Sequence, residues 1–319
     1  MCEFIAEHKT RFPITAMCRA LSAHNIAIAA RTFHAWAMRA PSKRALWDTT
    51  VTEILAGYYE PDENGKRAPE CLYGAEKMWA HLHREGIEVA RCTVERLMRA
   101  GGWRGVTRRK KPPRTTTADP AAARAGDLVN RQFRVPAPNL LVVADFTYAP
   151  LESGRFVYTA FVIDAYAGRI VGWECSASKQ TAFVESALLQ AVALREREGN
   201  PVSSNMIHHS DAGSQYTSIR FGETLMLSDV RPSVGTVADA FDNALAETTI
   251  GLYKTEAVRD DSPFRTGPLR RLADVEHVTA AWVAWYNESR LMHRLGRKPP
   301  VEYEADYYAN LPQQEAADR

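Results

Sequence analysis

The sequence has few cysteines, and their spacing fits neither a disulfide scaffold nor a zinc module. The five cysteines are odd in number and widely separated, and no two of them form a C-x-x-C pair. Small extracellular domains held by disulfides and Cys-ligated structural zinc sites are therefore disfavoured. This cysteine usage is typical of a reduced, cytoplasmic protein.

Long apolar runs are also missing. No stretch of about 18 apolar residues occurs, which is the minimum expected for a membrane-spanning helix. The first eight residues lack the basic segment and apolar stretch of a secretory signal peptide. We therefore expect neither a membrane span nor a cleaved leader.

Positive and negative charges are nearly balanced in number. The 319 residues carry a formal net charge of +2, and the sequence pI is about 8.2. This is only mildly basic, so any argument for nucleic-acid binding must rest on local clusters of Lys and Arg. The 45% hydrophobic and 24% charged residues are ordinary for a folded protein of two or three domains.

The first part of the chain is predicted to be helical. Residues 1–60 show apolar residues at helical spacing and are expected to form an N-terminal helical region. Residues 61–114 are expected to form a helix-turn-helix-like DNA-binding unit with a basic tail, because two short helical segments flank a turn at Gly86. The second helix carries the DNA-binding candidates Arg91, Arg96 and Arg99. The alternative is a small helical hairpin with solvated arginines.

A basic segment follows this helical pair. Between Arg104 and Arg114 there is no acidic residue, and Pro112 and Pro113 disfavour a helix. Such a tether can follow a phosphate backbone, and the less favoured alternative is a solubilising linker. Its DNA-binding candidates are Arg108, Arg109, Lys110 and Lys111. Residues 115–138 are polar and proline-punctuated, which predicts a linker.

The pattern changes to strands after residue 139. Three strands at 140–148, 156–163 and 169–174 are close enough in sequence to form an antiparallel meander. A helix at 181–195, a strand at 206–209, a helix at 219–227, an edge strand at 230–232 and a helix at 238–255 follow. This order is that of an RNase H-like α/β domain, a mixed sheet flanked by helices, over residues 139–270. A C-terminal helical extension, residues 271–319, would bury Trp282, Trp285 and Tyr286 on a helix at 274–288.

Two aspartates lie where the apolar runs of predicted strands end. Asp145 comes directly after five apolar residues, and Asp211 follows the 206–209 strand, with Gly213 permitting an unusual turn. A carboxylate there is costly to bury unless it reaches the end of the sheet or binds a cation. If the strands are neighbours, both carboxylates can converge on shared divalent ions. Each aspartate alone is more often a turn or cap residue.

The third acid is predicted on the helix at 238–255. Asn243, Glu247 and Lys254 share one polar stripe, with Phe241, Leu245 and Leu252 facing the core. A stripe of amide, carboxylate and ammonium groups suits a site that binds metal and a phosphate chain together. Two metal ions about 3.5 to 4 Å apart can activate a nucleophile and stabilise the leaving oxygen of a phosphodiester. We therefore expect Asp145 to bridge two ions, with Asp211 and Glu247 each completing one coordination shell.

Several nearby residues could be mistaken for site residues. Asp164 is better explained as a hairpin-turn residue, and His208 and His209 as packing or supporting residues. Asp239 and Asp242 precede Glu247 on the same predicted helix, and Asp239 is nearly in line with its stripe.

The residues around the three acids resemble a known family. The motif from His209 to Thr217, the motif from Asp242 to Glu247 and the 35 residues between Asp211 and Glu247 are similar to the OrfB transposases of the bacterial "IS three" insertion-sequence family. These belong to the retroviral-integrase-like DDE superfamily, and the sequence looks closest to actinobacterial members. Further matching motifs, at 72–79, 91–98, 252–256 and 286–290, extend the resemblance over nearly the whole chain.

This resemblance implies a DNA transposase that nicks the 3′ ends of its element and joins them to a target. It implies Asp145, Asp211 and Glu247 as the catalytic metal ligands, two Mg²⁺ per site with Mn²⁺ as a substitute, and Lys254 against the DNA end. The partners would be element ends, target DNA, an upstream OrfA-type protein or fusion, and further copies of the chain on DNA in the bacterial nucleoid. Val142 and Ala212 depart from common family residues without removing a ligand, and no His-His-Cys-Cys zinc module is present.

Two other functions remain open from the sequence. A nuclease of the same fold would hydrolyse DNA without joining it, and a non-enzymatic regulator would bind element ends without nicking them.

Overall fold

The computed structural model describes residues 1–107, 126–129, 132–235 and 243–317, and side chains as far as Leu311. The chain forms two compact units, Met1–Ile54 and Leu55–Arg319. The finer domain boundaries predicted from the sequence remain predictions. None of the helices in the described ranges combines the length and the apolar character needed to cross a lipid bilayer.

The first unit is helical, as predicted. It contains α1 (Cys2–His8), α2 (Ile14–Ala23), α3 (Ala30–Ala37) and most of α4 (Lys43–Tyr59). Its core is small and consists of Ile5, Met17, Cys18 and Phe33, one or two residues from each of the first three helices.

The second unit begins with the predicted helical pair, α5 (Ala75–Arg84) and α6 (Arg91–Ala100). Val94, Leu97 and Met98 are buried on one face of α6, as their spacing predicted. A short helix, η1 (Pro69–Leu72), precedes α5. The pair is attached to the rest of the unit through Tyr73, whose hydroxyl accepts a hydrogen bond from the backbone nitrogen of Leu291 at 3.1 Å.

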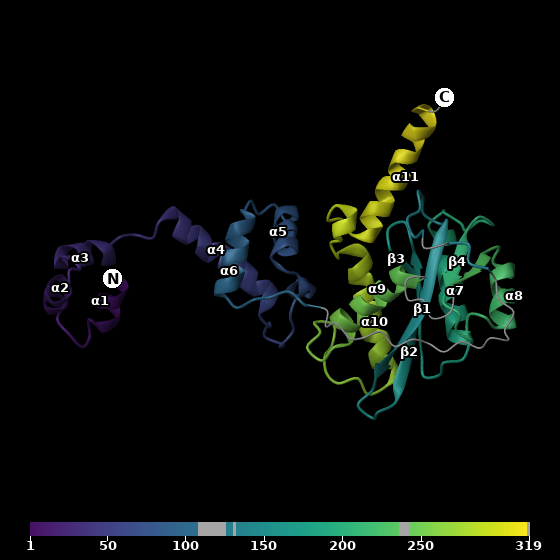
Figure 1. Cartoon of the computed structure of the whole chain (residues 1–319), viewed down its shortest axis with the longest axis horizontal. Helices are drawn as coiled ribbons and strands as arrows, with labels where there is room; N and C mark the ends of the chain where they lie inside the picture. Colours follow the sequence, from purple (N-terminus) through teal and green to yellow (C-terminus); the bar gives the residue numbers. More distant parts are fainter. Residues whose placement is uncertain (108–125, 130–131, 236–242, 318–319) are drawn as a thin grey trace. The chain divides into compact units, whose positions relative to one another are not determined.

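A five-stranded mixed sheet forms the centre of the second unit (Figure 1). Its strands are β1 (Leu141–Pro150), β2 (Phe156–Asp164), β3 (Arg169–Ser176), β4 (Ile207–Ser210) and β5 (Arg231–Val234), in the order β3-β2-β1-β4-β5. The first three strands are antiparallel, whereas β4 is parallel to β1 and β5 is parallel to β4. The predicted meander and the RNase H-like mixed sheet are therefore confirmed.

Helices cover both faces of this sheet because its strands are apolar on both sides. On one face α7 (Ala182–Arg197) and α8 (Ile219–Leu227) pack on Val142, Ala144 and their neighbours. Gly172 on β3 allows α7 to approach closely, since a Cβ there would lie 2.0 Å from the carbonyl oxygen of Ala187. On the other face the ring of Phe161 contacts Tyr253, at 5.0 Å between centroids, and Trp282, at 6.1 Å.

The helices of this second face follow in sequence. They are α9 (Ala244–Tyr253), the π-helical continuation η3 (Lys254–Val258) and α10 (Leu272–Glu288). Trp282, Trp285 and Tyr286 of α10 are buried, as predicted. The part of the predicted 238–255 helix before residue 243 lies outside the described residues. A short helix, η4 (His293–Leu295), leads to the last helix, α11 (Pro300–Ala317).

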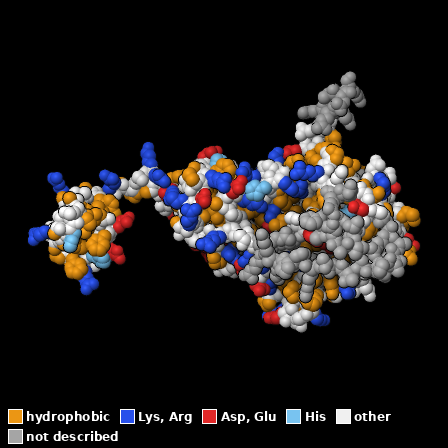
Figure 2. Space-filling model, viewed as in Figure 1, with side chains coloured by type: hydrophobic (Ala, Val, Ile, Leu, Met, Phe, Trp, Pro, Cys, Tyr) orange, Lys and Arg blue, Asp and Glu red, His pale blue; other side chains and the backbone are white. Residues whose placement is uncertain are grey.

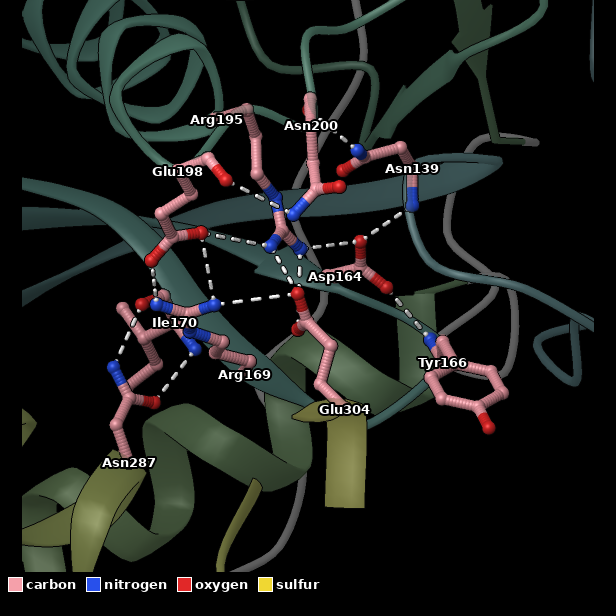
Figure 3. A network of polar contacts seen from close by, with 10 residues as sticks. All are labelled: Asn139, Asp164, Tyr166, Arg169, Ile170, Arg195, Glu198, Asn200, Asn287 and Glu304. Atoms are coloured by element: carbon pink, nitrogen blue, oxygen red, sulfur yellow. Dashed lines mark hydrogen bonds and ion pairs between the residues drawn. The ribbon is translucent and has the colours of Figure 1, made fainter. Parts of the chain in front are cut away.

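A buried ionic network attaches α11 to the sheet (Figure 3). Arg195 of α7 donates to Asp164 at the end of β2, at 2.9 Å, and to Glu304 of α11. All three side chains are at most 2% exposed. Asp164 also accepts hydrogen bonds from the backbone nitrogens of Asn139 and Tyr166, at 2.8 and 2.9 Å, which confirms its predicted turn role.

Candidate active site

Asp145 and Asp211 are brought together by the pairing of β1 with β4. The last pair in this parallel ladder is Ala144 with Ser210, so the next residue on each strand is an aspartate. Because the strands run in the same direction, both carboxylates leave the ladder at the same end. The predicted strand end at Asp145 needs one correction: β1 continues to Pro150, and it is β4 that ends here.

Each aspartate is oriented by a backbone hydrogen bond. Oδ1 of Asp145 accepts from the nitrogen of Phe146 at 2.7 Å, and Oδ1 of Asp211 accepts from the nitrogen of Gly213 at 3.1 Å. The sequence predicted that Gly213 supplies an unusual turn conformation, and this is wrong because Gly213 is not among the positive-φ glycines. The glycine at position 213 is instead explained by the limited space beside Asp211, because a Cβ there would lie 2.9 Å from Oδ1 of Asp211.

Asn243 positions the start of α9 against the strand that carries Asp145. Its Nδ2 donates to the carbonyl oxygen of Ala144 at 3.0 Å, and the side chain is only 6% exposed. The sequence suggested a DNA contact for Asn243, but in this structure its amide is directed into the protein. Glu247 lies one turn further along α9 and is exposed.

The inner face of α9 also differs from the prediction. Ala246, Thr249, Ile250 and Tyr253 are buried, whereas Leu245 and Leu252 are only partly buried. Phe241, predicted on the same inner face, lies outside the described residues.

Lys254 extends the site beyond the carboxylates. It is exposed, and its Nζ lies 5.2 Å from the centroid of the Tyr148 ring, within the range of a cation–π contact. The π-helical turn that begins at Lys254 is fixed by Glu256, which is buried and accepts from Nη2 of Arg290 at 2.6 Å. This ion pair joins the 252–256 motif to the 286–290 motif.

The neighbouring charges change the pKa of Asp145. Burial raises the pKa of its carboxyl well above the usual range, and the negative charges of Asp211 and Glu247 raise it further. The Phe146 amide and the Lys254 ammonium act in the opposite direction. Burial likewise raises the pKa of Asp211. The two other predicted acids and the predicted lysine are therefore all within electrostatic range of Asp145.

The three carboxylates are not assembled into a compact ligand set. Across the described ranges, no group of three or more His, Cys, Asp or Glu side chains is arranged to hold a metal ion. A cation at this site would have to draw the acids closer together. The donor chemistry suits it, because carboxylate oxygens are the ligands that hard divalent cations prefer and because a positive charge would relieve the repulsion at Asp145.

Tyr216 is buried within electrostatic range of two of the acids, which the sequence did not predict. It is 5% exposed, burial raises the pKa of its phenol, and the charges of Asp145 and Asp211 raise it further. Its hydroxyl is buried and has no hydrogen-bond partner among the described residues. Its position five residues after Asp211 in the sequence was the only available signal.

The two histidines before Asp211 are buried, in line with the packing interpretation. Burial lowers the pKa of His208 to about 4, so the ring is neutral at physiological pH. Nδ1 of His209 lies 2.9 Å from the hydroxyl oxygen of Ser233 on β5. The rival acids Asp239 and Asp242 lie outside the described residues.

The predicted DNA-binding arginines of α6 are exposed. Arg99 forms an ion pair with Glu95 at 3.2 Å, and Arg91 lies 4.0 Å from a carboxylate oxygen of Glu76. Arg96 is exposed on the same helix. The basic candidates at 108–111 lie outside the described residues.

Models of protein families match most of the chain. Integrase core domain models match residues 135–240 and 228–300, and an HTH-like domain model matches residues 63–111. Among solved structures, a simian T-cell lymphotropic virus intasome in complex with a PP2A regulatory subunit aligns with 73% of this chain and 70% of that chain, at 16% identity and a TM-score of 0.44.

Curated relatives are much more similar. The protein named "Putative transposase for insertion sequence element IS986/IS6110" from Mycobacterium tuberculosis is 49% identical over 282 residues, which cover 88% of this chain and 96% of the relative. The transposase for insertion sequence element IS629 from Shigella sonnei is 46% identical over 270 residues, covering 85% of this chain and 84% of the relative. The chain therefore belongs to the "IS three" family of insertion-sequence transposases in the integrase-like DDE superfamily, and it is a DNA transposase.

Proposed function

We propose that this transposase nicks the 3′ ends of its element and joins them to target DNA with Asp145, Asp211 and Glu247 as its catalytic carboxylates. The supporting observation is the electrostatic coupling at Asp145, whose pKa is raised by the charges of both other acids. Such repulsion is costly to keep at a partly buried position unless it serves a cation site.

The proposed cofactor is Mg²⁺, two ions per site, with Mn²⁺ as a substitute. Bound ions would supply a nucleophile at neutral pH and stabilise the charge on the leaving oxygen. Asp145 projects from β1 at the point where β4 ends, which suits a ligand shared between both ions. Asp211 and Glu247 come from different elements and would each complete one coordination shell.

Two phosphodiester exchanges would occur at these residues. In nicking, water attacks the phosphorus, the bond to the 3′ oxygen breaks, and a free 3′-hydroxyl and a 5′-phosphate result. In joining, that 3′-hydroxyl attacks a target phosphodiester, one new bond to phosphorus forms, and a target 3′-hydroxyl leaves. The carboxylates would orient the attacking and leaving oxygens in line.

Lys254 is proposed to contact a phosphate near the reacting DNA end. It is exposed, and it lies close enough to Asp145 for its charge to lower the pKa of that carboxyl. Arg91, Arg96 and Arg99 of α6 would contact the DNA backbone further from the site. Asn243 is proposed to act by positioning α9 rather than by touching DNA.

The proposed partners are the terminal repeats of the element and a target duplex. An upstream OrfA-type protein, or a fusion to it, and further copies of the chain are proposed to complete the assembly on DNA.

A strand-transfer assay tests this function. The full chain, alone and with its upstream partner, is incubated with a labelled element end, a target plasmid and Mg²⁺. We expect a covalent product for wild type and none for Asp145→Asn, Asp211→Asn or Glu247→Gln. A nicked product without any joined product would favour a nuclease. Near-normal nicking by a folded single variant would remove that residue from the proposed ligand set.

A further inference from the structure

The first three helices form a small helical module, outside the residues 63–111 matched by the HTH-like family model. Helix α2 ends at Ala23, and α3 begins at Ala30. The turn between them is fixed at Asn25, which has a left-handed φ of 62°, and the nitrogen of Ile26 donates back to the carbonyl oxygen of Leu21 at 2.9 Å. Helix α1 completes the core through Ile5. Two short helices joined by a turn and supported by a third are the architecture of many DNA-binding modules.

Helix α3 buries very little of its surface in this core. Phe33 is its one buried residue, at 3% exposed. Arg31 and Ala35 lie one turn apart on the opposite side of the helix, and both are exposed. A long arginine beside a small alanine suits a helix that enters the major groove, where Arg binds guanine edges and Ala can contact a thymine methyl group.

The charge of this segment differs sharply from that of the whole chain. Residues 1–44 contain seven Lys or Arg residues and only two acids, Glu3 and Glu7, whereas the whole chain carries a net charge of +2. The basic residues are Lys9, Arg11, Arg19, Arg31, Arg39, Lys43 and Arg44. Figure 2 shows Lys and Arg side chains projecting from several sides of this unit, at the left of the view. An excess of positive charge on a small helical module favours a polyanionic partner.

An apolar groove on the same unit offers a different partner class. It has a volume of about 480 Å³ and is lined by residues of α1, α2 and their connection, including Phe4, Phe12 and Leu21. None of its lining residues comes from α3. A protein docked in this groove would therefore not contact α3, and it would not explain why the face of α3 with Arg31 and Ala35 is exposed. Duplex DNA bound to α3 would use both that exposed face and the positive charge of the segment.

We propose that residues 1–44 form a second duplex-DNA-binding module, in which α3 enters the major groove and Arg31 is its principal contact. The module acts in addition to α5 and α6. This inference rests on the transposase function, because it assigns the module to DNA of the element ends.

The test measures DNA binding without chemistry. The full chain is titrated with a labelled duplex of the element terminus in EDTA, at several salt concentrations, and the protected region is mapped by footprinting. Arg31→Ala is compared with Arg197→Ala, which removes the same charge from an exposed position on α7. Alanine is the best helix former, so the variant should keep α3 folded, as circular dichroism would verify.

We expect Arg31→Ala to raise the Kd about ten-fold or more relative to Arg197→Ala, to lower the salt slope by about one and to lose part of the protected region. Exposed substitutions commonly change a binding or folding free energy by up to about 0.5 kcal/mol, which is about two-fold in Kd. A Kd for Arg31→Ala within about two-fold of the control would therefore overturn the proposal. If Phe12→Glu then changed the oligomeric state while Arg31→Ala bound DNA normally, the unit would be a protein-docking module.

The result is independent of the catalytic proposal. The binding measurement is made on protein with wild-type carboxylates in EDTA, where no Mg²⁺-dependent nicking occurs, so its outcome does not depend on which carboxylates are metal ligands. Failure of the binding test and failure of the catalytic test can therefore be told apart.

Discussion

Asn243 donates from its Nδ2 to the carbonyl oxygen of Ala144, 3.0 Å away and directly before Asp145 in the chain. The bond joins the N-terminal end of α9 to β1, so one buried amide connects the helix of Glu247 with the strand of Asp145. Neither residue type nor spacing indicated this role, because an exposed polar stripe and a buried positioning residue look alike at helical periodicity.

Asn243→Ala should slow nicking while leaving affinity for the element end unchanged. Loss of the amide leaves a buried carbonyl unpaired, which costs about 1 to 3 kcal/mol, and releases the start of α9. Single-turnover rates and the Kd measured in EDTA separate the two effects. Asn310→Ala is the matched control, because Asn310 is exposed and its amide donates to the carbonyl oxygen of Asp306 one turn earlier on the same helix. A selective loss of DNA affinity would instead restore the DNA-contact interpretation.

Asp145→Asn should make the metal-free protein more stable. The folded-state pKa of Asp145 is raised, so ionisation disfavours folding as the pH rises above the unfolded-state value, and Asn removes that penalty. The expected rise in Tm in EDTA is a few degrees, and Mg²⁺ should stabilise wild type more than the variant.

Asp229→Asn is the control for the loss of one negative charge. Asp229 is exposed and has a φ of 55°, a conformation that Asn tolerates as well as Asp. Equal Mg²⁺ stabilisation of wild type and Asp145→Asn would count against a metal site at Asp145.

Gly213→Ala should reduce nicking with little effect on stability. The added Cβ would lie 2.9 Å from Oδ1 of Asp211, so the carboxylate must shift from its backbone hydrogen bond. Gly222→Ala is the control, since nothing lies within 4 Å of a Cβ there and Gly222 is inside α8. That change should stabilise the protein by up to about 1 kcal/mol. Wild-type nicking by Gly213→Ala would show that Asp211 tolerates the shift.

Much of the core domain could be predicted because its signals are local. The apolar run before Asp145 and the acid after β4 mark strands by composition alone, and the order of elements then predicts a mixed sheet. Whether the strands of Asp145 and Asp211 are neighbours was left open by the sequence, and the parallel pairing of β1 with β4 in the structure is what brings the two aspartates together.

Contacts between distant segments could not be predicted in the same way. Glu304 is separated by 109 positions from Arg195, to which it is bonded, and nothing in the α11 sequence distinguishes it from a solvated acid. Tyr216 was missed for a similar reason, because an aromatic residue in a polar loop gives no sign that it is buried beside two carboxylates. Charged residues are seldom fully buried, so the default expectation is a surface position.

The network around Glu304 therefore gives the sharpest stability prediction (Figure 3). Glu304→Gln should lower the free energy of unfolding by about 3 to 5 kcal/mol, because Arg195 would keep its buried charge with one anionic partner fewer. Glu302→Gln lies two positions away on the same helix, and its ion pair with Arg84 is partly solvated, at 36% and 42% exposed, so its cost should stay below about 1 kcal/mol. Urea unfolding of both variants measures the difference. Equal costs would mean that α11 is held by its apolar contacts rather than by the buried charge.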